Sequence, residues 1–172
     1  MISARASLAA TAASRVSLMP VALSLCPRRL RCLVVDDERA SRVMLRTFLN
    51  NWAVSCHEAE DGSEAIQWLE EPGHALPDFV LTDIEMPRCD GLTLFRQIRS
   101  SSNRAVRELP VAMMSTCGLQ ELDRTFRVIT PLCFFSKPID LVELRRLIEY
   151  FRAQLDRAPR TERPQDAPDV HD

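Results

Sequence analysis

Residues 78–92 read DFVLTDIEMPRCDGL, an apolar run that stops at Asp83 and continues into a loop with Met-Pro and a glycine. The run is short and bounded by polar residues, which predicts a buried strand over residues 78–82. Residues 92–100 follow with apolar side chains at helical spacing, which predicts a helix. A strand, a loop and a helix in this order make one unit of a parallel sheet.

The same alternation extends outward on both sides of this block. It predicts further strands over residues 30–35, 53–57, 110–114 and 132–135. It predicts further helices over residues 39–50, 63–70, 119–128 and 141–151. Strict alternation indicates an α/β fold, in which a single doubly wound, five-stranded parallel sheet carries helices on both faces. The second strand is expected at an edge of that sheet.

The composition bounds the class of protein. The chain has 172 residues, of which 46% are apolar and 27% charged, a balance that can bury one core. No stretch of 18 apolar residues is present, so no membrane-spanning helix is expected. The 24 acidic and 22 basic residues leave a net charge of -2, which gives no reason to expect direct binding of nucleic acid.

The two ends of the chain differ from its middle. Residues 1–29 contain no acid, and we interpret them as a disordered or mis-assigned extension; a transit peptide, a weak signal peptide and a true start at Met19 are the alternatives. Residues 154–172 are rich in proline and charge, which predicts a disordered tail. The expected domain spans residues 30–153. Six scattered cysteines without a CxxC pair argue against a zinc site and favour a reduced, cytoplasmic protein.

Polar residues stand at the ends of four predicted strands, namely Asp36 and Asp37, Asp83, Ser115, and Lys137. In a parallel sheet these residues meet at the carboxyl edge, where open α/β sheets bind ligands. Three aspartates against one lysine leave two negative charges, which a divalent cation would neutralise. Carboxylate oxygens suit Mg²⁺, and a carboxylate beside Mg²⁺, a hydroxyl and a lysine is equipped to attack phosphorus. Lys137 is also the single lysine among the 22 basic residues.

Five motifs carry a resemblance to a known family. They are LVVDDE at residues 33–38, EAEDGSEAI at 58–66, DFVLTDIEMPRCDGL at 78–92, PVAMMST at 110–116 and FFSKP at 134–138. Together and in this order they resemble the receiver domain of bacterial two-component response regulators, of the single-domain type. The resemblance covers about residues 30–152 and implies a flavodoxin-like fold of the receiver type.

The resemblance implies a role for each residue at the strand ends. Asp83 matches the phosphoacceptor, and Lys137 matches the lysine that pairs with the phosphoryl group. A Mg²⁺ site would be formed by Asp36, Asp37, Asp83 and the main-chain carbonyl of Glu85. The chain would then catalyse only its own phosphorylation and slow autodephosphorylation, and would not be an enzyme with a separate substrate.

Two further residues match the family's switch. Ser115 matches the hydroxyl that turns toward the phosphoryl group, and Phe134 matches the switch aromatic, although it lacks a hydroxyl. The chain departs from the usual pattern at Thr116, whose β-branched side chain would narrow access to Asp83. Glu85 departs as well, because it puts a carboxylate beside the site.

The resemblance also implies two kinds of partner. The phosphoryl donor would be a sensor histidine kinase or a histidine phosphotransfer protein. No output domain is recognisable after residue 153, so output is expected through a protein target that contacts the fourth helix, fifth strand and fifth helix, roughly residues 119–151.

The residues leave three alternatives. A haloacid-dehalogenase-type phosphatase also has a nucleophilic aspartate, but on an early strand and with a second aspartate two residues later, where this chain has Glu85. A flavodoxin-like cofactor binder would need a phosphate loop after the first strand, where the acidic sequence DDERAS instead repels phosphate. A degenerate receiver that serves as a scaffold would lack a required group, and none is lacking.

Overall fold

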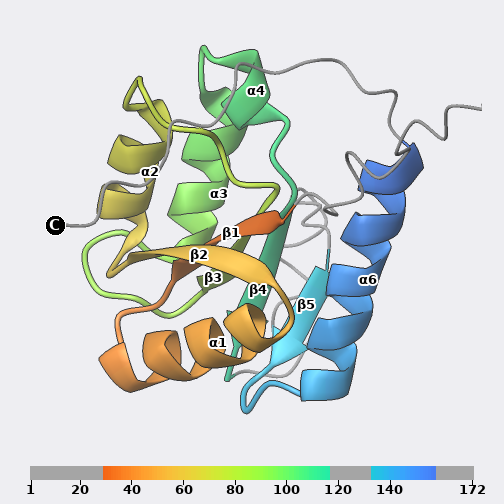
Figure 1. Cartoon of the computed structure of the whole chain (residues 1–172). Coiled ribbons are helices and arrows are strands. Elements are labelled where there is room, and N and C mark those ends of the chain that lie inside the picture. Colours follow the sequence, from red (N-terminus) through yellow and green to blue (C-terminus); the bar gives the residue numbers. More distant parts are fainter. Residues whose placement is uncertain (1–28, 117–132, 158–172) are drawn as a thin grey trace, which may run out of the picture.

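The structure is a computed structural model that describes residues 29–116 and 133–157. Its centre is a five-stranded sheet in the order β2-β1-β3-β4-β5, with all neighbouring strands parallel (Figure 1). The strands are β1 (Leu30–Val35), β2 (Val54–Ala59), β3 (Phe79–Asp83), β4 (Val111–Ser115) and β5 (Cys133–Ser136). The predicted fold class is therefore confirmed, including the edge position of the second strand.

The helices cover both faces of this sheet. They are α1 (Arg39–Asn51), α2 (Gly62–Glu70), α3 (Gly91–Ser100), the short α4 (Arg104–Arg107) and α6 (Leu141–Arg157). Figure 1 shows α2 and α3 side by side on one side of the sheet, with α1 and α6 on the other. None of the helices in the described ranges combines the length and the apolar character needed to cross a bilayer.

Each face of the sheet has its own hydrophobic cluster. Successive residues of β1 show this, because Leu33 and Val35 pack beneath α2 and α3 while Cys32 and Val34 pack beneath α1 and α6. All four are at most 1% exposed. A strand buried on both faces needs a continuous apolar run, and each such side chain contributes about 1.5–3 kcal/mol on burial.

Polar side chains begin several helices. Asp61 accepts hydrogen bonds from the backbone N–H groups at the start of α2, and Asp90 accepts one at the start of α3. Asp140 accepts one from Val142 in the first turn of α6. These carboxylates satisfy N–H groups that have no partner inside the helix, so the loops at the carboxyl edge end at defined residues.

The boundaries differ from the predicted ones in a few places. β2 runs to Ala59 rather than residue 57, because its pairing with β1 continues to the pair Val35 and Ala59. α6 continues beyond residue 151 to Arg157, so the predicted tail begins inside a helix. The short α4 was not predicted, because its four residues are too few to show the hydrophobic period of a helix. The predicted helix over residues 119–128 lies outside the described residues.

Candidate functional site

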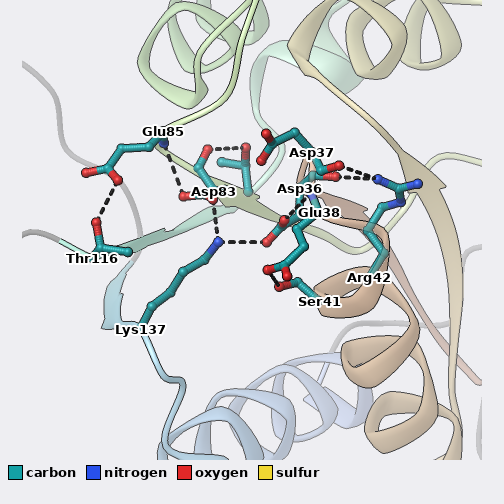
Figure 2. A network of polar contacts seen from close by, with 10 residues as sticks. Asp36, Asp37, Glu38, Ser41, Arg42, Asp83, Glu85, Thr116 and Lys137 are labelled. Carbon is teal, nitrogen blue, oxygen red and sulfur yellow. Dashed lines mark hydrogen bonds and ion pairs between the residues drawn. The ribbon is translucent and has the colours of Figure 1, made fainter.

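The carboxyl edge of the sheet gathers three aspartates. Asp36 and Asp37 follow β1, and Asp83 is the last residue of β3. One carboxylate oxygen from each lies within 4.8 Å of the others. Figure 2 shows the three side chains next to one another. Asp36 is fully buried and Asp83 is 4% exposed, whereas Asp37 is exposed. The predicted convergence of these three side chains is present in the structure.

Lys137 reaches the same cluster from the end of β5, which is an edge strand of the sheet. It follows β5, and its backbone N–H donates to the carbonyl of Ser115 at 2.8 Å. Its ammonium donates to Oδ2 of Asp36 at 2.8 Å and to Oδ2 of Asp83. Burial by itself would lower the pKa of Lys137, but the hydrogen bonds to Asp36 and Asp83 outweigh it and raise that pKa. The lysine is therefore charged.

The charge of the cluster is not balanced by Lys137 alone. Burial raises the pKa of Asp83, against the hydrogen bonds from Lys137 and from the Glu85 N–H, which lower it. Two negative charges remain when the three carboxylates are ionised and one is offset by the ammonium. Clustered oxygen ligands with surplus negative charge are the donor set that Mg²⁺ prefers. The residues present therefore fit a magnesium ion.

The loop between β3 and α3 leaves no room for a side chain at Gly91. Its N–H donates to the carbonyl of Ile84 at 3.0 Å, which folds the loop back on the end of β3. A Cβ atom at Gly91 would stand 2.1 Å from the carbonyl oxygen of Asp83. Glycine is therefore required for this close approach of two backbone segments.

The same loop is held at a second point by an ion pair. Arg88, whose φ of 66° is left-handed, pairs with the buried Asp61 at the start of α2, at 2.5 Å. Because Asp61 also caps α2, the loop and that helix start are joined. This fixes the segment that carries residues 84–90 beside the acidic cluster.

Glu85 lies at the rim of the site. Its N–H donates to Oδ1 of Asp83 at 3.1 Å, while its carboxylate accepts a hydrogen bond from the hydroxyl of Thr116 at 2.6 Å (Figure 2). The side chain thus points to Thr116 rather than into the group of three aspartates. The predicted role of its main-chain carbonyl as a metal ligand stays a prediction.

The two predicted switch residues are adjacent to the site but differ in environment. Ser115 is the last residue of β4 and is 2% exposed. Phe134 lies in β5 opposite Met113 and packs, half-buried, against the cluster beneath α2 and α3. Their switching roles stay predictions.

A cavity of about 370 Å³ opens beside the acidic cluster. Asp36, Lys137 and Thr116 line its polar side, and Met44, Met114 and Ile139 are among its apolar lining. A reacting group could approach the cluster from this side, since the lining includes Asp36 of the cluster and Lys137, which donates to Asp36 and Asp83.

One residue near the site was not identified from the sequence. Arg42 of α1 is 6% exposed and donates to the backbone of the Asp36–Asp37 pair. Among so many arginines, no pattern in the sequence distinguishes this one.

Comparisons with known sequences identify the family. The family described as the response regulator receiver domain matches residues 32–149. The gliding motility regulatory protein of Myxococcus xanthus is 33% identical over 102 residues, which cover 59% of this chain and 12% of that protein. Response regulator MprA of Mycobacterium sp. (strain KMS) is 40% identical over 85 residues, covering 49% of this chain and 34% of that protein. The matches thus span a minor part of both relatives.

Solved structures agree with this match. A response regulator receiver protein from Pseudomonas putida shares 28% identity with a TM-score of 0.61, covering 71% of this chain and 97% of that one. The receiver domain of sensor histidine kinase PA1611 from Pseudomonas aeruginosa, solved with magnesium in its active-site cleft, has 22% identity and a TM-score of 0.63, covering 72% and 98%. The acidic cluster, the sheet order and the family match lead to one conclusion: the chain belongs to the response regulator receiver domain family of two-component signalling.

Proposed function

We propose that this protein accepts a phosphoryl group on Asp83 in a Mg²⁺-dependent reaction and passes the signal to a protein partner. The donor is a sensor histidine kinase or a histidine phosphotransfer protein. The observation that carries the proposal is the contact of Asp83 with Lys137 inside a cluster of three carboxylates.

The chemistry is a transfer between two side chains. An Oδ atom of Asp83 attacks the phosphorus of a phosphohistidine, a P–O bond forms, the P–N bond breaks, and the imidazole leaves with the bonding electron pair. When bound, Mg²⁺ would neutralise charge on the phosphoryl oxygens. Asp36 and Asp37 would hold the ion together with Asp83. Lys137, already hydrogen-bonded to Asp83, is positioned to pair with a phosphoryl oxygen.

The phosphoryl group leaves Asp83 by self-catalysed hydrolysis, so we propose no separate substrate and no enzyme activity toward other molecules. At the rim of the site, the hydroxyl of Thr116 donates a hydrogen bond to the carboxylate of Glu85. This supports the expectation that Thr116 narrows access to Asp83. Ser115 and Phe134 would report the phosphorylated state.

The proposed output surface includes β5 and α6. Val142 and Tyr150 of α6 are 59% and 49% exposed, which leaves apolar area for a protein target. The remainder of the predicted surface, over residues 119–132, lies outside the described residues. A cytoplasmic location, where histidine kinases deliver phosphoryl groups, belongs to the same proposal.

Labelling with acetyl phosphate or phosphoramidate tests the phosphoacceptor. We expect intact-mass spectrometry to detect one added phosphoryl group with Mg²⁺ and none after chelation. Asp83→Asn should abolish labelling. Asp78→Asn is the matched control, because Asp78 precedes β3 at the opposite end and accepts a hydrogen bond from the Arg31 N–H at 2.9 Å. Labelling that survives in Asp83→Asn would contradict the proposal.

A further inference from the structure

A buried arginine stands behind the acidic pair. Arg42 is 6% exposed, whereas the next two residues of α1, Val43 and Met44, are 39% and 44% exposed. Arginine is rarely buried unless its charge and its N–H groups have partners. The position of Arg42, facing inward from an otherwise solvent-exposed turn, therefore needs an explanation.

The guanidinium of Arg42 joins the ends of two strands. Its Nη1 donates to the main-chain carbonyl of Asp36 at 2.7 Å and to that of Asp37 at 3.2 Å. Its Nη2 donates to Glu60 at 3.1 Å, and its Nε forms an ion pair with Glu58 at 3.5 Å. Figure 2 shows the planar group reaching from α1 to the main chain of the acidic pair.

Electrostatic repulsion favours a displacement of Asp37 away from Asp83, whereas Lys137 holds Asp36 beside Asp83. Three carboxylates within 4.8 Å repel one another, and Asp37 is exposed, so its side chain could turn into water at little cost. The direction of each side chain follows from the main chain that bears it. Holding the two carbonyls therefore holds the two carboxylates in the orientation that a metal ion needs.

We propose that Arg42 is a positioning residue for the Mg²⁺ site, which it serves by holding the main chain of Asp36 and Asp37 against the end of β2. This inference rests on the proposed function. In none of the hydrogen bonds and ion pairs described above does Arg42 touch Asp83 or reach into the space between the three carboxylates. Groups that orient metal ligands without touching the metal typically change metal affinity 10–100-fold when they are lost.

Positioning and simple charge predict opposite results. Arg42 carries a positive charge close to a site for a cation, so through charge alone its loss would tighten Mg²⁺ binding. Loss of the positioning contacts would instead weaken binding, because the ion would have to order the acidic pair itself. The sign of the change in affinity therefore decides between the two roles.

The experiment measures Mg²⁺ affinity of the full chain by isothermal titration calorimetry for Arg42→Met and Arg42→Lys. We expect both to weaken Mg²⁺ binding about tenfold or more. Lysine keeps the charge against Glu58 and Glu60 but cannot donate in the same plane to two carbonyls and two carboxylates. Arg42→Lys therefore decides the matter if Arg42→Met does not fold.

Arg46→Met is the matched control. Arg46 lies one turn further along α1, is about half-exposed, and pairs with Glu58 at 2.9 Å. Its loss removes the same charge from the same helix but no contact to the acidic pair, so Mg²⁺ affinity should be unchanged or slightly higher. Urea unfolding without Mg²⁺, run in parallel, reports stability separately from affinity.

Unchanged or tighter Mg²⁺ binding by folded Arg42→Lys overturns the positioning role and leaves the proposed function standing. A loss of stability with no change in Mg²⁺ affinity has the same meaning, because it shows a structural role only. If the wild-type chain binds no Mg²⁺, or if Asp83→Asn does not weaken its Mg²⁺ binding, both the proposed function and this inference fail.

Discussion

Lys137 holds two carboxylates with one ammonium group. Its contacts to Asp36 and Asp83 span the sheet from β5 to β1 and β3, and the side chain is 20% exposed. A compact ammonium with rotatable donors can meet two acceptors from different directions, whereas a guanidinium has donors fixed in a plane. This difference explains why a chain that otherwise uses arginine for its positive charges has lysine here.

Lys137→Arg should keep the fold but weaken coupling to phosphorylation. Loss of one good charge-assisted hydrogen bond costs roughly 1.5–3 kcal/mol, which lowers the population of the activated state about ten- to a hundredfold. NMR signals of Phe134 in the chemically phosphorylated protein measure that population. Arg145→Lys, at an exposed pair with Glu149, is the control and should behave as wild type. Equal populations in Lys137→Arg and wild type would show that the identity of the cation is unimportant.

At the scale of elements, the β3–α3 loop depends on a close approach that composition does not reveal. Gly91 stands against the carbonyl of Asp83, and Asp90 caps α3 through the Thr93 N–H at 2.6 Å. The cap defines where the helix starts, and the glycine lets the loop return to the strand end. Together they hold the loop that follows Asp83 against the carboxyl edge of the sheet.

Gly91→Ala should lower both stability and labelling. The added Cβ would lie 2.1 Å from the Asp83 carbonyl oxygen, so the main chain must shift, at a cost of roughly 1–3 kcal/mol. Urea unfolding and labelling with phosphoramidate measure the two effects.

The control is Gly73→Ala, because Gly73 has a φ of +106° but no atom within 4 Å of an added Cβ. Its strained backbone costs about 1–2 kcal/mol, without any effect at Asp83. Gly91→Ala and Gly73→Ala should therefore have similar stability, but only Gly91→Ala should show reduced labelling of Asp83. Normal labelling of Gly91→Ala would mean that the Asp83 carbonyl tolerates displacement.

At the scale of the whole molecule, the fold brings together residues that are separate in the sequence. His57 on the edge strand stacks on Trp68 of α2 with ring centroids 4.0 Å apart, and Trp68 stacks on His74 of the following loop at 4.2 Å. No spacing in the sequence pairs these rings, because their shared contact depends on how α2 lies over β2.

This stack predicts a pH dependence of stability. Burial lowers the pKa of His57, with His74 adding to the effect and Glu64 and Glu58 opposing it. The folded pKa is therefore below the unfolded value of about 6.5, so the unfolded state binds more protons between the two values. The contribution of His57 is fully present above about pH 6.5 and is lost as the pH falls toward the folded pKa.

His57→Phe should reduce that dependence, since phenylalanine keeps a ring against Trp68 but does not titrate. Urea midpoints at about pH 5.5 and pH 8 for the variant and the wild type measure the difference between them. Groups that do not interact with His57 contribute equally to both proteins and cancel in the comparison. If the variant and the wild type show the same pH dependence, the loss of stability at low pH comes from groups other than His57.

The fold and most of the candidate site could be predicted because both follow from local patterns. Short apolar runs that alternate with helical periods indicate a parallel sheet, and any residue at the end of such a strand must lie at one edge. Asp36, Asp83 and Lys137 could therefore be placed together before their contacts were known. Some observed strand boundaries differ from the predicted ones, because pairing with a neighbouring strand, not composition, decides where a strand stops.

The sequence by itself determined the sheet, its carboxyl edge and the acids and lysine that meet there. The tertiary structure alone decided that Arg42 holds the acidic pair, that Glu85 turns to Thr116, and that Trp68 lies between two histidines. The physical reason is that periodicity reports which side of its own element a residue faces. A contact with another element also depends on register, crossing geometry and rotamer, which are settled only when the elements pack.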